Sequence, residues 1–229
     1  MKTRFTFALG LIIIALLSAC TIIPSHTLQT VYPQMYQDSP ASILILPPLN
    51  NSTAADAKEY FSCSLSEAVG RKGYYTLPVE TMFTVLREEG LYDTENITPV
   101  VLKNMREHFG ADAVLISTIE EWDKSWALVA GSLNITSSFT LISTATADTL
   151  WDYRMRTSVE LGSDSKKFLV QVLESAFKTA VEDYFPNCLE SNITAMDNAL
   201  PYGKHHPQFT LDAEQGVSPG KSGRIDINK

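Results

Sequence analysis

The sequence predicts an α/β (α+β) fold in which helices pack on the faces of a single mixed sheet of about five strands. A continuous apolar run over 42–48 ends in two prolines and is typical of a strand buried on both faces. Apolar side chains recur at helical spacing over 54–69 and again over 99–109. Over 133–159 the apolar period changes to two, which indicates half-exposed antiparallel strands. Buried strands therefore come early in the chain, and exposed antiparallel strands come late.

Local signals at the segment ends set the order of the elements. Gly70 or Gly73 can end the first helix, because glycine adopts the left-handed conformation that follows many helices. Thr98 and Pro99 provide an N-cap and a first-turn proline for a later helix, which Gly110 stops. In chain order, the expected elements are a strand at 42–48, a helix at 54–69, a strand at 73–78, helices at 80–89 and 99–109, a strand at 113–122, strands at 133–141 and 151–159, and a helix at 165–185 closed by Pro186.

Composition divides the chain into four expected parts. The segment 21–40 contains three prolines and no sustained apolar period, which indicates a tether. Apolar density falls near the carboxyl end, and the final residues are expected to be disordered. The expected parts are a signal peptide at 1–19, a lipidated amino terminus and tether at 20–40, an α/β domain at 41–190 and a carboxyl-terminal tail at 191–229.

The first 19 residues have the pattern of a secretory signal. Lys2 and Arg4 form a positive region, and a mainly apolar run follows over 5–19. That run is shorter than the roughly 20 apolar residues that a membrane-spanning helix needs. We therefore expect a signal that is cleaved.

Leu17, Ser18, Ala19 and Cys20 resemble a bacterial lipobox. The resemblance implies that cleavage falls before Cys20, that its thiol carries a diacylglyceryl group and that its new amine is acylated. An ordinary signal peptide followed by a chance cysteine is the alternative. Thr21 is not the aspartate that usually retains lipoproteins in the inner membrane, so we expect attachment through lipid chains to the periplasmic face of the outer membrane.

The charge balance excludes some classes of partner. Removal of residues 1–19 takes two of the 18 basic residues, which leaves 16 against 26 acidic residues and a net charge of −10. Nucleic acid and anionic lipid headgroups both require a basic surface. Neither is therefore expected as a partner.

Two cysteines, Cys63 and Cys188, remain after the anchor. A disulfide between them would be permitted in the oxidising periplasm, and two separate buried thiols are the alternative. No metal site is expected, because the sequence has no CxxC pair and the histidines His205 and His206 lie in a polar segment.

The sequence contains no P-loop and no HExxH. The letters GVSPG at 216–220 match GxSxG, but they lie in the final segment expected to be disordered and form no strand-to-helix elbow. Glu120 and Glu121 could pass for paired carboxylates, but neighbouring residues of a regular strand point to opposite faces. They are therefore not expected to converge. His108 is expected to be a surface residue of the helix that ends at Gly110. These observations predict a protein that is not an enzyme and has no cofactor.

Trp122 and Trp126 flank a short polar stretch and form a possible interaction surface. Two large aromatic rings near a turn suit contact with a carbohydrate, a peptide or another protein. The alternative is that one ring is part of the core and the other lies under a loop.

Four stretches, together with the lipobox, resemble a family of bacterial lipoproteins of unknown function that includes a neisserial surface-lipoprotein antigen. The stretches are ILILPPLNNSTAADAKEYF, LREEGLYDTENITP, FGADAVLISTIEEWDKSW and LPYGKHHP. The domain of that family is similar to the amino-terminal domain of TolB and to the periplasmic domain of CsgG. The resemblance implies an envelope component without a known catalytic centre, with a CsgG-like lipoprotein as a possible partner. The chain lacks the long amphipathic hairpins that a CsgG-type pore requires.

Taken together, these features predict a lipid-anchored, non-enzymatic interaction or assembly component of a cell-envelope secretion or transport complex. An open sheet has edges that need pairing or cover, which favours self-association. The alternative is a periplasmic module that binds a glycan, a lipid or a peptidoglycan fragment.

Overall fold

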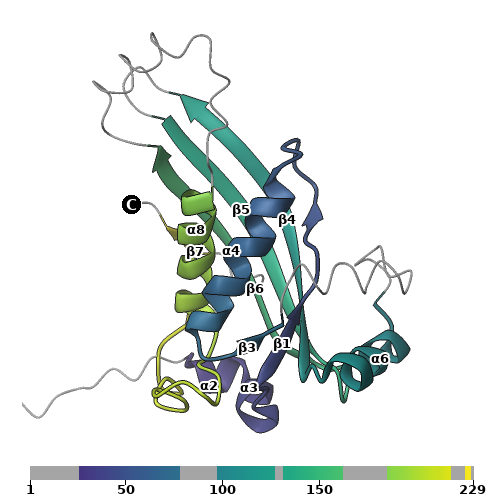
Figure 1. Ribbon diagram of the computed structural model, residues 1–229. Coiled ribbons are helices and arrows are strands. Elements are labelled where there is room, and N and C mark those ends of the chain that lie inside the picture. The colour runs from purple at the N-terminus through teal and green to yellow at the C-terminus, as the bar shows by residue number, and fades with distance from the viewer. Residues whose placement is uncertain (1–25, 78–96, 127–130, 162–184, 218–224, 228–229) are drawn as a thin grey trace, which may run out of the picture.

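The computed structural model describes residues 26–77, 97–126, 131–161, 185–217 and 225–227. They form one mixed sheet with helices on its faces, so the predicted fold class is confirmed (Figure 1). Within this described part of the chain, no helix combines the length and the apolar character needed to cross a bilayer.

The sheet has seven strands, and two short ones, at 49–50 and 225–227, lie outside the predicted set. Its order is β3-β1-β4-β5-β6-β7, and the short strand β2 also pairs with β4. Strand β1 runs parallel to β3 and β4, whereas β4, β5 and β6 form an antiparallel meander. The strands are β1 (Ser42–Ile45), β2 (Leu49–Asn50), β3 (Tyr75–Thr76), β4 (Ala113–Trp126), β5 (Gly131–Ser143), β6 (Thr149–Leu161) and β7 (Ile225–Ile227).

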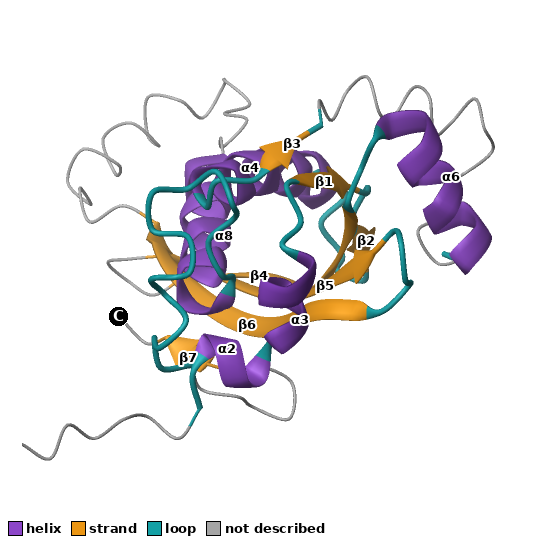
Figure 2. Cartoon of the chain, turned by 90° about the horizontal axis from the view of Figure 1, so that it is seen from below, coloured by secondary structure: helices purple, strands orange, loops and turns teal. Residues whose placement is uncertain are grey.

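Helices α4 (Ala57–Arg71) and α8 (Phe185–Ala199) lie side by side against one face of the sheet, which we call the inner face. Figure 2 shows the sheet curving around this helix pair. Helix α6 (Pro99–Phe109) packs on the opposite, outer face, where Leu102 and Met105 form a small cluster with Val114 of β4.

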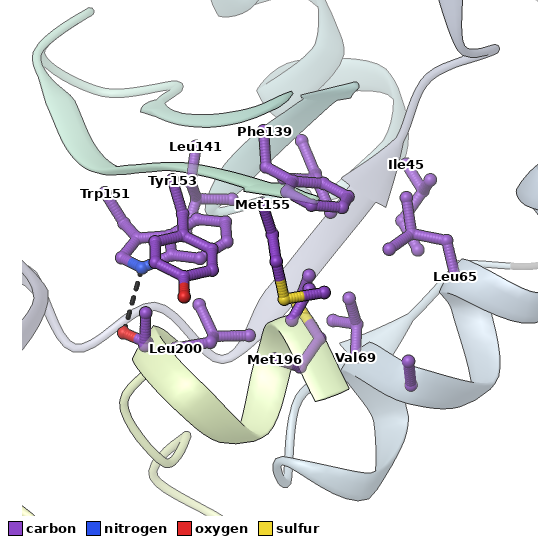
Figure 3. Packing of buried hydrophobic residues seen from close by; sticks show 14 of the residues in the cluster. Ile45, Leu65, Val69, Phe139, Leu141, Trp151, Tyr153, Met155, Met196 and Leu200 are labelled. Atoms are coloured by element: carbon purple, nitrogen blue, oxygen red, sulfur yellow. Dashed lines mark hydrogen bonds between the residues drawn. The ribbon is translucent and has the colours of Figure 1, made fainter. Parts of the chain in front are cut away.

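The main core lies between the inner face and the helix pair (Figure 3). Trp151 is fully buried at one end of this core, with its ring 6.0 Å from each of the rings of Phe139 and Tyr153. Its indole Nε1 donates a 2.9 Å hydrogen bond to the carbonyl oxygen of Ala199, the last residue of α8. The ring therefore joins the meander to the end of that helix.

The predicted end signals of α6 are confirmed. The Thr98 side chain accepts a 3.3 Å hydrogen bond from the backbone N–H of Val101, and Pro99 occupies the first turn. Gly110 ends the helix with φ at +66°, in the left-handed region. Helix α4 occupies the position predicted for the first helix, shifted by two to three residues. The helix expected at 80–89 falls on 78–96, outside the described residues, as does the helix expected at 165–185 except for its last residue, which begins α8.

The expected tether at 20–40 is wrong over its second half. Residues 28–38 form two short helices, α2 (Leu28–Val31) and α3 (Pro33–Asp38). Leu28, Tyr32 and Met35 are buried in the main core. The prediction treated the prolines as signs of an irregular tether. Pro33 instead occupies the first turn of α3, where a proline is compatible with a helix.

The expected carboxyl-terminal boundary at 190 is also wrong. Helix α8 runs from 185 to 199, and Pro186, expected to close a helix, lies in its first turn. Its buried face carries Cys188, Ser191, Asn192, Ala195, Met196 and Ala199. Residues 225–227, expected to be disordered, pair with β6 as strand β7. The folded body therefore extends beyond 41–190 in both directions.

Candidate functional site

A β-bulge in β4 places two glutamates on the same face of the sheet. Ile119 pairs with Ser137 and Glu121 pairs with Thr136, so Glu120 is an extra residue in the ladder. The alternation of side chains between the two faces of the sheet therefore shifts by one residue at this point. The expectation that Glu120 and Glu121 diverge is wrong, because it assumed a regular strand.

Both glutamates engage arginines of β6 on the outer face. The Nε of Arg154 donates to the two carboxylate oxygens of Glu120 at 3.0 and 2.8 Å. Thr136 donates to Glu121 at 2.7 Å, and Arg156 lies 3.8 Å from the same carboxylate. We call Glu120, Glu121, Arg154 and Arg156 the outer-face quartet.

The quartet is only partly accessible. The side chains of Glu120 and Arg154 are 27% and 29% exposed, whereas those of Glu121 and Arg156 are 44% and 46% exposed. Each carboxylate has an arginine partner, which leaves neither of them placed as a general base. This arrangement presents fixed charges of both signs, which suits recognition of a polar protein surface.

The hydrogen bond from Arg154 holds the pKa of Glu120 below its usual value, and the arginine's charge acts in the same direction while burial opposes it. A carboxylate with a lowered pKa in the folded state stabilises that state above its ordinary pKa of 4.5. This contribution is lost as the pH falls through the lower, folded-state pKa. We expect Glu120→Gln to remove about 0.5–1 kcal/mol of stability at pH 7 and less in more acidic solution.

Urea unfolding of the wild type and of Glu120→Gln at pH 7 and at pH 3 measures this difference. Arg154→Gln is the matched control, because it removes the other half of the same pair. In both variants the free energy of unfolding should lose the same part of its dependence on pH. An equal difference from the wild type at both pH values would contradict the prediction.

The same bulge turns Trp122 into the core. Trp122 is 4% exposed and belongs to the main core cluster with Ile119. Its expected role in an interaction surface is therefore wrong, since its ring is buried. Trp126 ends β4, and its side chain lies outside the described part of the structure. The hypothesis of a paired aromatic contact for a glycan or peptide thus loses one of its two rings.

Cys63 and Cys188 are both free thiols, on neighbouring helices α4 and α8. The structure therefore shows the unbridged alternative, but only one of the two thiols is buried. Cys63 is exposed, whereas Cys188 is buried and its sulfur accepts a 3.3 Å hydrogen bond from Ser64. Burial raises the pKa of Cys188 to about 12, against the opposing effect of the Ser64 hydrogen bond.

We expect a maleimide to modify Cys63 and to spare Cys188 in the folded protein at pH 7. The thiolate is the reactive species, and a buried thiol with a raised pKa is protonated and inaccessible. Peptide mass spectrometry after brief labelling measures both sites, and labelling in urea provides the control in which both react. Equal labelling of the two cysteines in the folded protein would contradict the expectation.

A second polar cluster fixes the segment 200–217, which we call the strap. Lys72, at the end of α4, is buried and places its Nζ 3.7 Å from the ring centre of Tyr202. His206 stacks on the same tyrosine, with ring centres 4.0 Å apart. Burial lowers the pKa of Lys72, and the charges of Asp197 and Asp212 oppose that shift.

The strap approaches α4 closely because two glycines leave room for it. The backbone N–H of Gly203 donates to the carbonyl of Lys72 at 2.7 Å. Gly73 has φ at +85°, and a Cβ built on it would lie 2.5 Å from the Cβ of His206. The stretch LPYGKHHP therefore forms the contact with the end of α4. From the sequence alone, this stretch had indicated only a family resemblance.

The strap also pairs with the first described residues of the chain. Leu28 N–H donates to Gln215 O at 2.9 Å, and Val217 N–H donates to His26 O at 3.0 Å. Buried Asp212 accepts hydrogen bonds from the Tyr36 hydroxyl at 3.3 Å and from the backbone N–H of Tyr202 at 2.6 Å. Sequence reasoning missed this pairing, because it joins segments nearly 190 residues apart.

The lipobox residues Leu17, Ser18, Ala19 and Cys20 lie in 1–25, outside the described residues, so their role stays a prediction. Among the residues that the structure describes, no group of three or more His, Cys, Asp or Glu side chains is placed to hold a metal ion.

Comparison with known proteins gives related lipoproteins. Residues 30–205 match the family model described as "Putative lipoprotein GNA1162-like". "Putative lipoprotein NMB1124/NMB1162" of Neisseria meningitidis serogroup B is 27% identical over 143 residues, which are 62% of this chain and 66% of that protein. The chain thus spans slightly less than two thirds of that relative's length.

Solved structures with a similar course of the chain include two bacterial proteins. The crystal structure of lipoprotein GNA1162 from Neisseria meningitidis has a TM-score of 0.46 and 26% identity, covering 60% of this chain and 94% of that one. A PelC dodecamer from Paraburkholderia phytofirmans has a TM-score of 0.42 and 13% identity, covering 68% and 84% of the two chains.

The family match confirms the resemblance that the sequence motifs indicated. It covers well over half of the chain and extends from α2 through the LPYGKH segment of the strap. The chain belongs to the GNA1162-like lipoprotein family.

Proposed function

We propose that this lipoprotein is anchored through Cys20 to the periplasmic face of the outer membrane, after removal of residues 1–19 as a signal peptide. There it acts without enzymatic activity, as an interaction component of a cell-envelope secretion or transport complex. The observation that carries the proposal is the outer-face quartet, an ordered set of charges on the side of the sheet away from α4 and α8.

The geometry of this face favours a protein partner. Among the described residues, α6 packs on the outer face near Leu44, Val114 and Ile142, at the end of the meander away from the bulge. The quartet lies further along β4 and β6, and the exposed residue Asp152 extends the charged surface. Fixed charges of both signs give specificity to a protein interface and do not require a deep pocket.

Photocrosslinking in the native envelope tests the partner. A benzophenone amino acid replaces Asp152 on the outer face, and a matched control replaces Glu59, an exposed residue of α4. We expect Asp152 to give a discrete protein adduct and Glu59 to give none. Self-adducts of twice the chain mass would identify a second copy as the partner. Absence of protein adducts from Asp152, or equal adducts from both positions, would overturn the proposed interface.

Palmitate labelling tests the anchor separately. The wild type should incorporate labelled palmitate and fractionate with the outer membrane. Cys20→Ala should lose the label, accumulate as a precursor of larger mass and leave that fraction. An unmodified thiol at Cys20 in the purified native protein would overturn the anchoring without bearing on the protein interface.

A further inference from the structure

The strap fixes the chain at His26, only six residues after the proposed anchor Cys20. The carbonyl of His26 accepts a hydrogen bond from Val217, and the next two residues, Thr27 and Leu28, are buried. Residues 21–25 alone therefore separate Cys20 from the folded body. A fully extended residue spans about 3.3–3.6 Å, so this link reaches at most about 20 Å.

A link this short determines which end of the domain faces the bilayer. Helices α2 and α3 and the strap lie together at one end, which we call the base (Figure 1). Figure 2 views the molecule from this end. The loop before α4, at 51–56, lies at the opposite end of the same helix from Lys72 and the strap. The base must therefore lie close to the membrane surface, with that loop pointing away from it.

The base carries an apolar side chain without cover. Leu211 is 76% exposed, the largest exposed fraction among the large hydrophobic residues that the structure describes. Its neighbour in the chain, Asp212, is buried and hydrogen-bonded to Tyr36 and Tyr202, so the backbone that carries Leu211 is held in place. Lys204, further back in the strap, is also exposed.

We propose that the strap rests on the bilayer that holds the anchor, with Leu211 inserted at the boundary between headgroups and acyl chains. The inference rests on the proposed lipidation of Cys20. Because the mature chain is acidic, the contact is apolar and takes a zwitterionic lipid surface rather than an anionic one. The acyl chains and the strap then fix the orientation of the domain, and the outer-face quartet stands clear of the membrane.

Fluorescence of the full-length lipidated protein in vesicles of phosphatidylcholine and phosphatidylethanolamine tests this orientation. An environment-sensitive fluorophore is attached at Leu211→Cys, and at Ala55→Cys as the control at the opposite end. Both variants carry Cys63→Ser, so that the exposed native thiol does not react. Both sites are exposed, and neither substitution disturbs the core.

We expect brominated lipid to quench the probe at 211 at least threefold more than the probe at 55, with a blue-shifted emission at 211 alone. Flotation of the vesicles is measured on the same samples. Protein that floats with equal, weak quenching at both sites would overturn the membrane contact while leaving the anchor intact. Protein that does not float would overturn the proposed anchoring, and this inference with it.

Discussion

Replacement of Trp151 by alanine is expected to lower the free energy of unfolding by about 3–5 kcal/mol, the usual range for truncating a buried aromatic side chain. The side chain is fully buried, and its ring packs against those of Phe139 and Tyr153. The substitution also leaves the carbonyl of Ala199 without its indole donor, which adds the cost of an unpaired buried acceptor. Urea unfolding followed by circular dichroism measures the change.

Two controls separate cavity formation from the lost hydrogen bond. Trp151→Phe keeps an aromatic ring and removes the donor, so it should cost clearly less than the alanine variant. Tyr75→Ala removes a ring that is 60% exposed and should change stability by no more than about 0.5 kcal/mol. Equal losses from Trp151→Ala and Tyr75→Ala would contradict the placement of Trp151 in the core.

Replacement of Gly73 by alanine is expected to destabilise the protein by about 2–3 kcal/mol. Alanine is strained at a φ of +85°, and its Cβ would lie 2.7 Å from the backbone nitrogen of His206. Because the obstacle includes backbone atoms, the strap must move and loosen its contacts with Lys72. We expect lower stability in urea and faster amide exchange at Gly203 and His206.

Gly70→Ala is the matched control, three residues away in the same chain segment. Gly70 lies within α4, and an added Cβ would meet no atom within 4 Å. Alanine is favoured over glycine inside a helix by about 0.5–1 kcal/mol, so this variant should be neutral or more stable than the wild type. If both glycine variants behaved alike, the close approach of the strap to Gly73 would be refuted.

Much of the sheet and two of the helices that pack on it could be predicted, because the sequence patterns that indicate them are local. The continuous apolar run at β1 and the alternation in β5 and β6 each identify a strand from its own residues. Thr98, Pro99 and Gly110 mark the ends of α6 in the same way. Such patterns depend on neighbours in the sequence, so no knowledge of the rest of the fold was required.

The features that sequence reasoning missed depend on distant partners. The bulge at Glu120 is visible only from the pairing of β4 with β5, and it alone decides that Trp122 faces inward. The helical spacing of Cys188, Ser191 and Ala195 was available as a signal in α8, but their polar and small side chains concealed it. The strap could not be recognised because its contacts lie on residues near the opposite end of the chain.

The pairing of 26–29 with 213–217 also constrains the order in which this molecule can mature. A polypeptide that crosses a membrane amino terminus first leaves its early residues without these hydrogen-bonding partners until almost the whole chain has followed. The meander, by contrast, joins strands that are close in sequence and can assemble sooner. Completion of the base would therefore be among the last steps of folding, and the proposed removal of residues 1–19 would act on a chain whose base has not yet formed.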